Sequence, residues 1–324
     1  MLKVENLNVS FETRRGIVNV IENLNFTVEP GRTLGIVGES GSGKSVTSLA
    51  IMGLLPPNAR VTSGRILLGD KDLLRASESE MQEIRGGRLA MIFQDPMTSL
   101  NPSFTVGFQL EEAMRVHGVK GNLRERAIEM LKLVGIPDPA LRLSSYPHQL
   151  SGGMSQRVMI AMAIACSPEF LIADEPTTAL DVTIQAQILA LLKKVQKERN
   201  MGLILITHDI GVVAQMADDI LVMYAGHAME MGPKEEVIHR PRHPYTKALL
   251  ASLPASHAQS GFRTRLPTIS GLVPDLLNRP TGCQLHPRCE YANENCKAQM
   301  PSIHHVGGSL VKCHRPLEPA GGHA

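Results

Sequence analysis

Short apolar runs and amphipathic stretches alternate along the first two thirds of the chain. Segments 3–11 and 18–28 carry β-branched residues with partial alternation, which predicts two strands. Three further runs are apolar throughout, as expected of parallel strands buried on both faces: 33–37, 170–173 and 203–206. The stretch 183–199 between the last two has the pattern of an amphipathic helix. Strand, helix and strand in this order predict a parallel α/β fold.

Helical patterns interrupt these strands, and the composition changes near the C-terminus. Residues 46–55 have helical composition, and Pro56-Pro57 then predicts the end of that helix. Much of 107–166 has apolar residues at helical spacing. After about residue 235, proline, histidine and arginine become frequent. We therefore expect a first domain over 1–235, with a helical subdomain at about 95–168, and a loop-rich extension over 236–324.

Composition and charge narrow the class of protein. The chain has 324 residues, 43% of them apolar, which predicts a globular protein of two or three subdomains. No apolar run approaches the roughly 20 residues of a membrane helix, and the N-terminus does not resemble a signal peptide. We expect a cytosolic protein whose membrane role, if any, depends on partners. A net charge of +2 and the lack of Trp give little support for nucleic-acid binding.

A complete phosphate-loop motif follows the run 33–37. Residues 38–45, Gly-Glu-Ser-Gly-Ser-Gly-Lys-Ser, match G-x-x-x-x-G-K-[ST]. Glycines let backbone N–H groups wrap the β-phosphate, Lys44 adds a positive charge, and Ser45 is a ligand for Mg²⁺. ATP and Mg²⁺ are thus the expected cofactors. The expected nucleotide-binding residues here are Gly38, Ser40, Gly41, Ser42, Gly43, Lys44, Ser45 and Val46.

Two later strands end in residues that suit phosphate chemistry. The run 170–173 is followed by Asp174 and Glu175, and the run 203–206 by Thr207 and His208. Because ligands gather at the carboxyl ends of parallel strands, we expect these groups near the phosphate loop. Asp174 suits the Mg²⁺ site, Glu175 suits a general base for the attacking water, and His208 suits a contact with the γ-phosphate.

The segment Leu150-Ser151-Gly152-Gly153-Met154-Ser155-Gln156 offers a second anion site at a predicted helix N-terminus. Two such elements far apart in sequence suggest a nucleotide held between two subunits. With this segment the chain resembles the nucleotide-binding subunits of ABC transporters over about residues 1–235. Six elements carry the resemblance: the phosphate loop, the Q-loop Phe93-Gln94-Asp95-Pro96, this signature segment, Asp174-Glu175, the D-loop Ala179-Leu180-Asp181 and His208.

The resemblance implies a fold and a set of roles. The fold is a P-loop NTPase (RecA-like) core with an N-terminal antiparallel β subdomain, an inserted α-helical subdomain and a loop-rich C-terminal extension. Gln94 would contact Mg²⁺ or the attacking water, and Asp181 would lie at the dimer interface. Phe11 matches the aromatic residue that stacks on adenine, although it also suits a core position. ATP held by the opposite subunit would be bound by Ser151, Gly152, Gly153 and Gln156.

Four further segments resemble the ATPases of peptide importers and extend the similarity to nearly the whole chain: Met97-Thr98-Ser99-Leu100-Asn101-Pro102, Arg242-His243-Pro244-Tyr245-Thr246-Lys247-Ala248-Leu249-Leu250, Pro280-Thr281-Gly282-Cys283 and Pro287-Arg288-Cys289. Within this subfamily the chain most resembles the ATP-binding subunits of dipeptide permeases. This resemblance implies a subunit that hydrolyses ATP to power import of dipeptides or short oligopeptides. The implied partners are a second, homologous ATPase subunit in a heterodimer, two transmembrane permease subunits and an extracytoplasmic peptide-binding protein. The implied location is the cytoplasmic face of the bacterial inner membrane, with no nucleic-acid partner.

Alternatives to peptide import come from the same machinery and from another class. Nickel, glutathione, haem and peptide antibiotics are other cargoes of this subfamily. A soluble ABC ATPase that acts on DNA or the ribosome is a remote alternative, because such proteins usually carry two cassettes or a long coiled-coil insertion. A nucleotide-binding adaptor without turnover conflicts with the intact Glu175 and His208.

Four of the five cysteines fall near the C-terminus. Cys283, Cys289, Cys296 and Cys313 have the spacing C-x5-C-x6-C-x16-C. In a cytosolic protein this clustering suggests a metal before a disulfide. Four thiolates can hold Zn²⁺ or a [4Fe–4S] cluster, and unligated thiols remain a third interpretation. The resemblance favours the iron–sulfur cluster, in a structural role.

Overall fold

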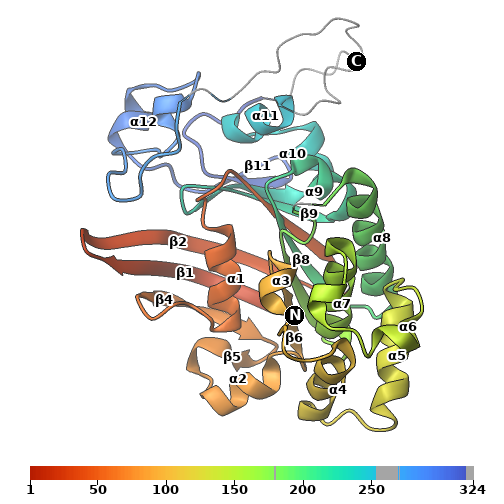
Figure 1. Cartoon of the computed structure of the whole chain (residues 1–324). Helices are drawn as coiled ribbons and strands as arrows, with labels where there is room; N and C mark the ends of the chain where they lie inside the picture. The colour runs from red at the N-terminus through yellow and green to blue at the C-terminus, as the bar shows by residue number, and fades with distance from the viewer. Residues whose placement is uncertain (179, 253–268, 270, 319–324) are drawn as a thin grey trace, which may run out of the picture. The chain divides into compact units, whose positions relative to one another are not determined.

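The structure is a computed structural model of the chain, and it describes residues 1–178, 180–252, 269 and 271–318 (Figure 1). The chain divides into two compact units. The first consists of Met1–Leu2, Val28–Arg32 and Leu68–Ile206. The second consists of Lys3–Thr27, Thr33–Leu67 and Thr207–Ala324. The two units are described separately below.

The first unit contains a parallel sheet and most of the long helices. Its strands are β5 (Lys71–Asp72), β6 (Leu89–Ile92), β7 (Phe170–Asp174) and β8 (Gly202–Thr207). Its helices are α2 (Glu78–Ile84), α3 (Pro96–Ser99), α4 (Val106–Val116), α5 (Leu123–Leu133), α6 (Pro139–Arg142), α7 (Gly152–Ile164) and α8 (Val182–Glu198). Strands β8, β7 and β6 are neighbours in that order and run parallel. The predicted parallel α/β construction is confirmed here.

Complete burial explains why β7 is apolar from Phe170 to Ala173, up to its last residue, Asp174. All five of its residues are buried, and β8 is buried as thoroughly. A strand covered on both faces has no polar side to present, so its sequence shows no alternation. The register places Ala173 opposite Ile92 of β6 and Asp174 opposite Ile206 of β8. The three strands therefore end at one edge of the sheet.

Helix α7 contacts α3, α4, α5 and β6, whereas α6 packs on α5 (Figure 1). Their N-termini are set by local side-chain caps. Thr105 caps α4, Asn122 caps α5 and Ser151 caps α7, in each case by accepting a backbone N–H of the first turn. Such caps satisfy donors that the helix itself leaves without partners. The result is a helical cluster inserted between β6 and β7.

The second unit contains two sheets and shorter helices. Its strands are β1 (Leu2–Thr13), β2 (Gly16–Val28), β3 (Thr33–Val37), β4 (Ala59–Leu68), β9 (Asp219–Tyr224), β10 (His227–Pro233), β11 (His304–Val306) and β12 (Ser309–Val311). Its helices are α1 (Lys44–Met52), α9 (Ile210–Met216), α10 (Lys234–His239), α11 (Pro244–Ala251) and α12 (Glu294–Ala298). Strands β2, β1 and β4 form the predicted antiparallel N-terminal sheet in that order. The other five strands of this unit are neighbours in the order β11-β12-β10-β9-β3, and β3 and β9 are parallel.

Helix α1 ends earlier than the sequence pattern predicts. It runs from Lys44 to Met52, whereas 46–55 was expected from composition with Pro56-Pro57 as the stop. Gly53 has a φ of 63°, in the left-handed region, and its N–H closes the helix by donating to the carbonyl oxygens of Ala50 and Leu49. A glycine in this conformation ends a helix by itself, so the two prolines follow a helix that has already stopped.

The C-terminal region, residues 236–318 as far as they are described, shares a hydrophobic core with strands β3 and β9 of the same unit. Cys283, Leu285 and Cys296 are buried in one cluster with Val37 of β3 and Tyr224 of β9. A region rich in proline, with few helices and strands of its own, therefore remains ordered by packing on β3 and β9. Among the described residues, no helix combines the length and the apolar character that crossing a bilayer requires.

A buried histidine at the start of α11 makes stability depend on pH. His243 is 1% exposed, and its Nδ1 accepts the N–H of Tyr245. Burial lowers the pKa of His243 to about 3, whereas an unfolded chain has the ordinary value of about 6.5. Between these values the unfolded state binds more protons, so stability falls as the pH drops below about 6.5. At pH 5 the loss from this group amounts to about 2 kcal/mol.

We therefore expect the variant His243→Asn to lose less thermal stability than the parent protein between pH 7 and pH 5. Asparagine keeps an acceptor that can cap the helix but does not titrate in this range. Melting temperatures at the two pH values measure the effect. Equal losses in the two proteins would contradict the assignment of the acid sensitivity to His243.

Candidate functional site

The phosphate loop, residues 38–45, joins the end of β3 to the start of α1. Gly41 and Gly43 have φ angles of 78° and 101°, a conformation that residues with a Cβ rarely adopt. A Cβ on Gly38 would lie 2.1 Å from the carbonyl oxygen of Met223 on β9. Glycine is thus required where the loop leaves the sheet, because the backbone of β9 passes too close for any side chain.

Lys44 provides the positive charge of this loop. It is the first residue of α1, and its side chain is buried. Its ammonium group donates to the carbonyl oxygens of Gly38 at 2.8 Å and Glu39 at 3.0 Å. A lysine, turned glycine backbone and the positive end of a helix together make an anion site. All the nucleotide-binding residues predicted over 38–46 lie in this loop or in the first turn of α1, where Ser45 offers a hydroxyl suited to Mg²⁺.

In the first unit, the ends of β6 and β7 bring Gln94 and Glu175 together. Gln94 follows β6 by two residues, and its Nε2 donates to Glu175 Oε2 at 3.2 Å. Asp174, the last residue of β7, is buried. An amide and two carboxylates at one sheet edge are ligands of the kind that Mg²⁺ and a polarised water require.

Glu175 is held by both its backbone and its side chain. Its φ of 47° is uncommon for a residue other than glycine, and its N–H donates to the carbonyl oxygen of Ile206 at 2.8 Å. The hydroxyl of Thr178 donates to Glu175 Oε2 at 2.8 Å. Strained backbone of this kind is concentrated at functional sites. The sequence analysis does not predict a role for Thr178. A hydroxyl three residues after an acid at the end of a strand could have indicated this contact.

The signature segment opens onto solvent at the N-terminus of α7. Ser151 caps the helix, and its Oγ accepts the N–H of Met154 at 3.4 Å. Ser151 and Gly152 are exposed, and a Cβ on Gly152 would have no heavy atom within 4 Å. Gly153 is more confined, because its Cβ would lie 3.3 Å from Cγ2 of Ile184. This helix end is therefore accessible to a ligand.

Gln156, predicted with the signature as a nucleotide contact, has another partner in the structure. Its side chain is buried, and its Nε2 donates to the carbonyl oxygen of Pro176 at 2.6 Å. Because Pro176 follows Glu175 directly, this bond connects α7 to the loop that carries the predicted base. Gln156 thus links these two elements, and its contact with nucleotide stays a prediction.

Three other predicted residues have definite places. Asp181 is exposed and caps α8 by accepting the N–H groups of Thr183 and Ile184, each at 3.0 Å. Ala179 of the same D-loop lies outside the described residues. His208 is exposed and directly follows β8, and Phe11 is half-buried on β1 and outside the hydrophobic core. Their roles with nucleotide stay predictions.

The four C-terminal cysteines gather in one region without forming a ligand set. Cys283 and Cys296 are buried, and the N–H of Cys283 donates to the carbonyl oxygen of Cys296 at 2.8 Å. Burial, with a smaller contribution from the nearby thiols, raises the pKa of Cys313 to about 11. Within the part of the chain that the structure describes, no group of three or more His, Cys, Asp or Glu side chains is arranged to hold a metal ion. The predicted iron–sulfur or zinc site is therefore not supported.

Comparison with protein families agrees with the loop, the strand-end acids and the fold. The ABC transporter family matches residues 21–178, and the oligopeptide/dipeptide transporter C-terminal region matches residues 229–296. The chain belongs to the ABC transporter family and is an ABC ATPase, as the sequence analysis predicts.

Similar proteins extend over almost the whole chain. The dipeptide transport ATP-binding protein DppD of Escherichia coli (strain K12) is 54% identical over 324 residues, which cover 99% of this chain and 98% of that protein. DppD of Bacillus subtilis (strain 168) is 55% identical over 292 residues, which cover 89% and 86% of the two chains.

Solved structures confirm the cassette fold. A dimeric ABC transporter cassette, MJ0796, in a post-hydrolysis state bound to ADP and Pi, is 28% identical and superimposes with a TM-score of 0.65 over 72% of this chain and 99% of that one. The cassette CbiO1 of Clostridium perfringens is 30% identical, with a TM-score of 0.62 over 74% of this chain and 90% of that one. The predicted P-loop NTPase fold is thus confirmed.

Proposed function

We propose that this chain is the subunit that hydrolyses ATP to power import of dipeptides or short oligopeptides. The observation that carries the proposal is the similarity to dipeptide transport ATP-binding proteins, which includes both the cassette and the C-terminal region. A similarity confined to the cassette would support an ABC ATPase of any kind. Similarity over 98% of the related protein supports the same kind of transporter.

The described residues support a division of chemical roles. The loop 38–45 and Lys44 bind the β- and γ-phosphates of ATP, and Ser45 and Asp174 with Gln94 hold Mg²⁺, which neutralises charge on the phosphates. Glu175 takes a proton from the attacking water as general base, and Thr178 keeps its carboxylate in place. His208 contacts the γ-phosphate.

The exposed end of α7 supports a partner subunit. Ser151, Gly152 and Gly153 present an open helix N-terminus, and we assign them to the γ-phosphate of ATP bound by a second, homologous ATPase subunit. Asp181 belongs to that interface. Two transmembrane permease subunits and an extracytoplasmic peptide-binding protein complete the transporter. The chain then lies peripherally at the cytoplasmic face of the bacterial inner membrane.

Growth on peptides tests this function. A strain whose chromosomal copy carries Glu175→Gln is grown with a single dipeptide, a longer peptide, haem or nickel as the limiting nutrient, with no redundant importer present. We expect selective loss of growth on the dipeptide. Full growth on every peptide, together with a loss on haem or nickel, would contradict peptide import and assign the transporter to that other solute.

A further inference from the structure

Glu39, the second residue of the phosphate loop, is held by contacts at three of its groups. Its carboxylate accepts hydrogen bonds from both terminal nitrogens of Arg288, at 2.7 and 3.0 Å. Its N–H donates to the hydroxyl of Tyr245 at 3.0 Å. Its carbonyl oxygen accepts from the ammonium of Lys44 at 3.0 Å and from the N–H of Ser42 at 3.2 Å. One residue thus connects the C-terminal region to the lysine of the loop.

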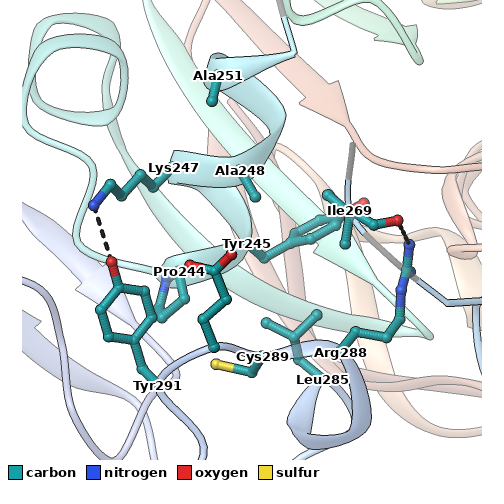
Figure 2. Close-up of a pocket in the computed structure, with 11 residues that line it drawn as sticks. Pro244, Tyr245, Lys247, Ala248, Ala251, Ile269, Leu285, Arg288, Cys289 and Tyr291 are labelled. Atoms are coloured by element: carbon teal, nitrogen blue, oxygen red, sulfur yellow. Dashed lines mark hydrogen bonds between the residues drawn. The ribbon is translucent and has the colours of Figure 1, made fainter. Parts of the chain in front are cut away.

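Arg288 is well suited to hold a carboxylate in one place. Its side chain is 4% exposed and ends the 3₁₀ turn His286–Arg288. The guanidinium also donates to the hydroxyl of Tyr224 at 3.2 Å and to the carbonyl oxygen of Ile269 at 3.2 Å, the bond drawn in Figure 2. Two parallel bonds to a carboxylate fix direction as well as distance. A buried guanidinium with this many partners has little freedom to move.

Tyr245 is equally constrained. It lies at the start of α11, is 1% exposed, and its ring centroid is 4.8 Å from that of Tyr224. Its N–H donates to His243, whose own N–H donates to the buried carboxylate of Glu230 at 2.9 Å. Figure 2 shows Tyr245 and Arg288 among the residues that line a cavity of about 210 Å³. The hydroxyl that receives the N–H of Glu39 therefore has a fixed position.

We propose that Arg288 and Tyr245 are positioning residues for the phosphate loop, and that the C-terminal region thereby raises the affinity of the cassette for ATP. The proposal rests on the function proposed above, in which Lys44 binds the phosphates. A loop with two left-handed glycines has many conformations, and each must be lost when a ligand binds. Holding Glu39 from its carboxylate and its N–H removes part of that cost beforehand.

Binding of Mg²⁺-ATP to the purified full-length chain tests the proposal, together with KM and kcat in the assembled transporter. We expect Glu39→Gln and Arg288→Met each to weaken ATP binding by about tenfold, since each breaks a charge-assisted bidentate pair. The double variant should bind ATP with the same affinity as the single variant that binds it less tightly, because both changes break the same contact. KM should rise while kcat at saturating ATP stays near the parent value, and Arg288→Lys should restore part of the affinity.

Arg242→Met is the matched control. Arg242 belongs to the same region and is half-buried, but its guanidinium donates to the carbonyl oxygen of Leu317. We expect this variant to keep the parent's affinity for ATP. An equal loss in Arg242→Met and Arg288→Met would show a general effect of the C-terminal region's stability and would overturn the positioning role.

Two further outcomes separate this inference from the proposed function. If Lys44→Ala abolishes ATP binding while Glu39→Gln leaves it unchanged, the positioning role is wrong and the ATP site stands. If Lys44→Ala binds ATP as the parent does, the proposed ATP site itself is wrong. Should Arg288→Met fail to fold, Glu39→Gln still decides, because its partly exposed side chain can be changed without opening a cavity.

Discussion

Replacing Glu175 with glutamine is expected to lower the rate of ATP hydrolysis by about 10²–10⁴-fold while ATP binding persists. Glutamine keeps an oxygen that accepts the Thr178 hydroxyl and still fits beside Gln94, but it cannot take a proton from water. Phosphate release and ATP affinity are measured on the same preparation of the assembled transporter. Loss of both would indicate a damaged site instead of a missing base.

Glu169→Gln is the matched control for this experiment. Glu169 directly precedes β7 and forms an ion pair with Arg88, whereas Glu175 directly follows the strand. The substitution is chemically identical, but it lies at the other end of the same strand. We expect hydrolysis close to that of the parent protein. A Glu175→Gln protein that hydrolyses ATP as fast as Glu169→Gln would refute the general-base assignment.

Replacing Gly38 with alanine is expected to disrupt the phosphate loop and to destabilise the second unit. The added Cβ would lie 2.1 Å from the carbonyl oxygen of Met223. The backbone determines the positions of both atoms, so no side-chain rotation can relieve the contact. Forcing an atom into packed surroundings costs about 1–3 kcal/mol or more. We expect a lower melting temperature and a loss of ATP binding of about tenfold or greater, since the loop must move away from β9.

Gly152→Ala provides the comparison for stability. Gly152 begins α7, and a Cβ there would meet no heavy atom within 4 Å. Its φ is also outside the positive range, so alanine is accommodated without strain. The melting temperature of this variant should match that of the parent. A similar decrease in Gly38→Ala and Gly152→Ala would contradict the close approach of β9 as the cause.

Much of the fold follows from local pattern. The apolar runs become β3, β7 and β8 nearly at the predicted residues, because strands buried on both faces are apolar over most of their length. Strand β9 was not among the predicted strands, although its residues 220–224 form an equally apolar run. The predicted end of α1 is wrong, because the helix is closed by the left-handed conformation of Gly53 and its backbone hydrogen bonds. Composition does not record these bonds.

The chemistry of the site depends on sequence and tertiary structure in different degrees. A phosphate loop is a local device, since glycines, a lysine and a helix N-terminus adjacent in sequence suffice to bind phosphate, and the sequence alone identifies it. The meeting of Gln94 with Glu175 was expected because both follow parallel strands. By contrast, the sequence suggested a ligand set for the four cysteines, which the described structure does not support. The spacing of cysteines along the sequence shows which thiols are present, but it does not determine how their Sγ atoms are arranged in space.

The sequence by itself determined that this protein is an ABC ATPase related to peptide importers, because the decisive residues are contiguous within short motifs. Only the tertiary structure decided which residues of the C-terminal region contact the phosphate loop. Arg288 and Tyr245 lie 249 and 206 residues from Glu39 in sequence, and no periodicity connects positions so far apart. Packing of the C-terminal region on β3 and β9 brings them together, since burial depends on which surfaces meet and not on their order in the chain.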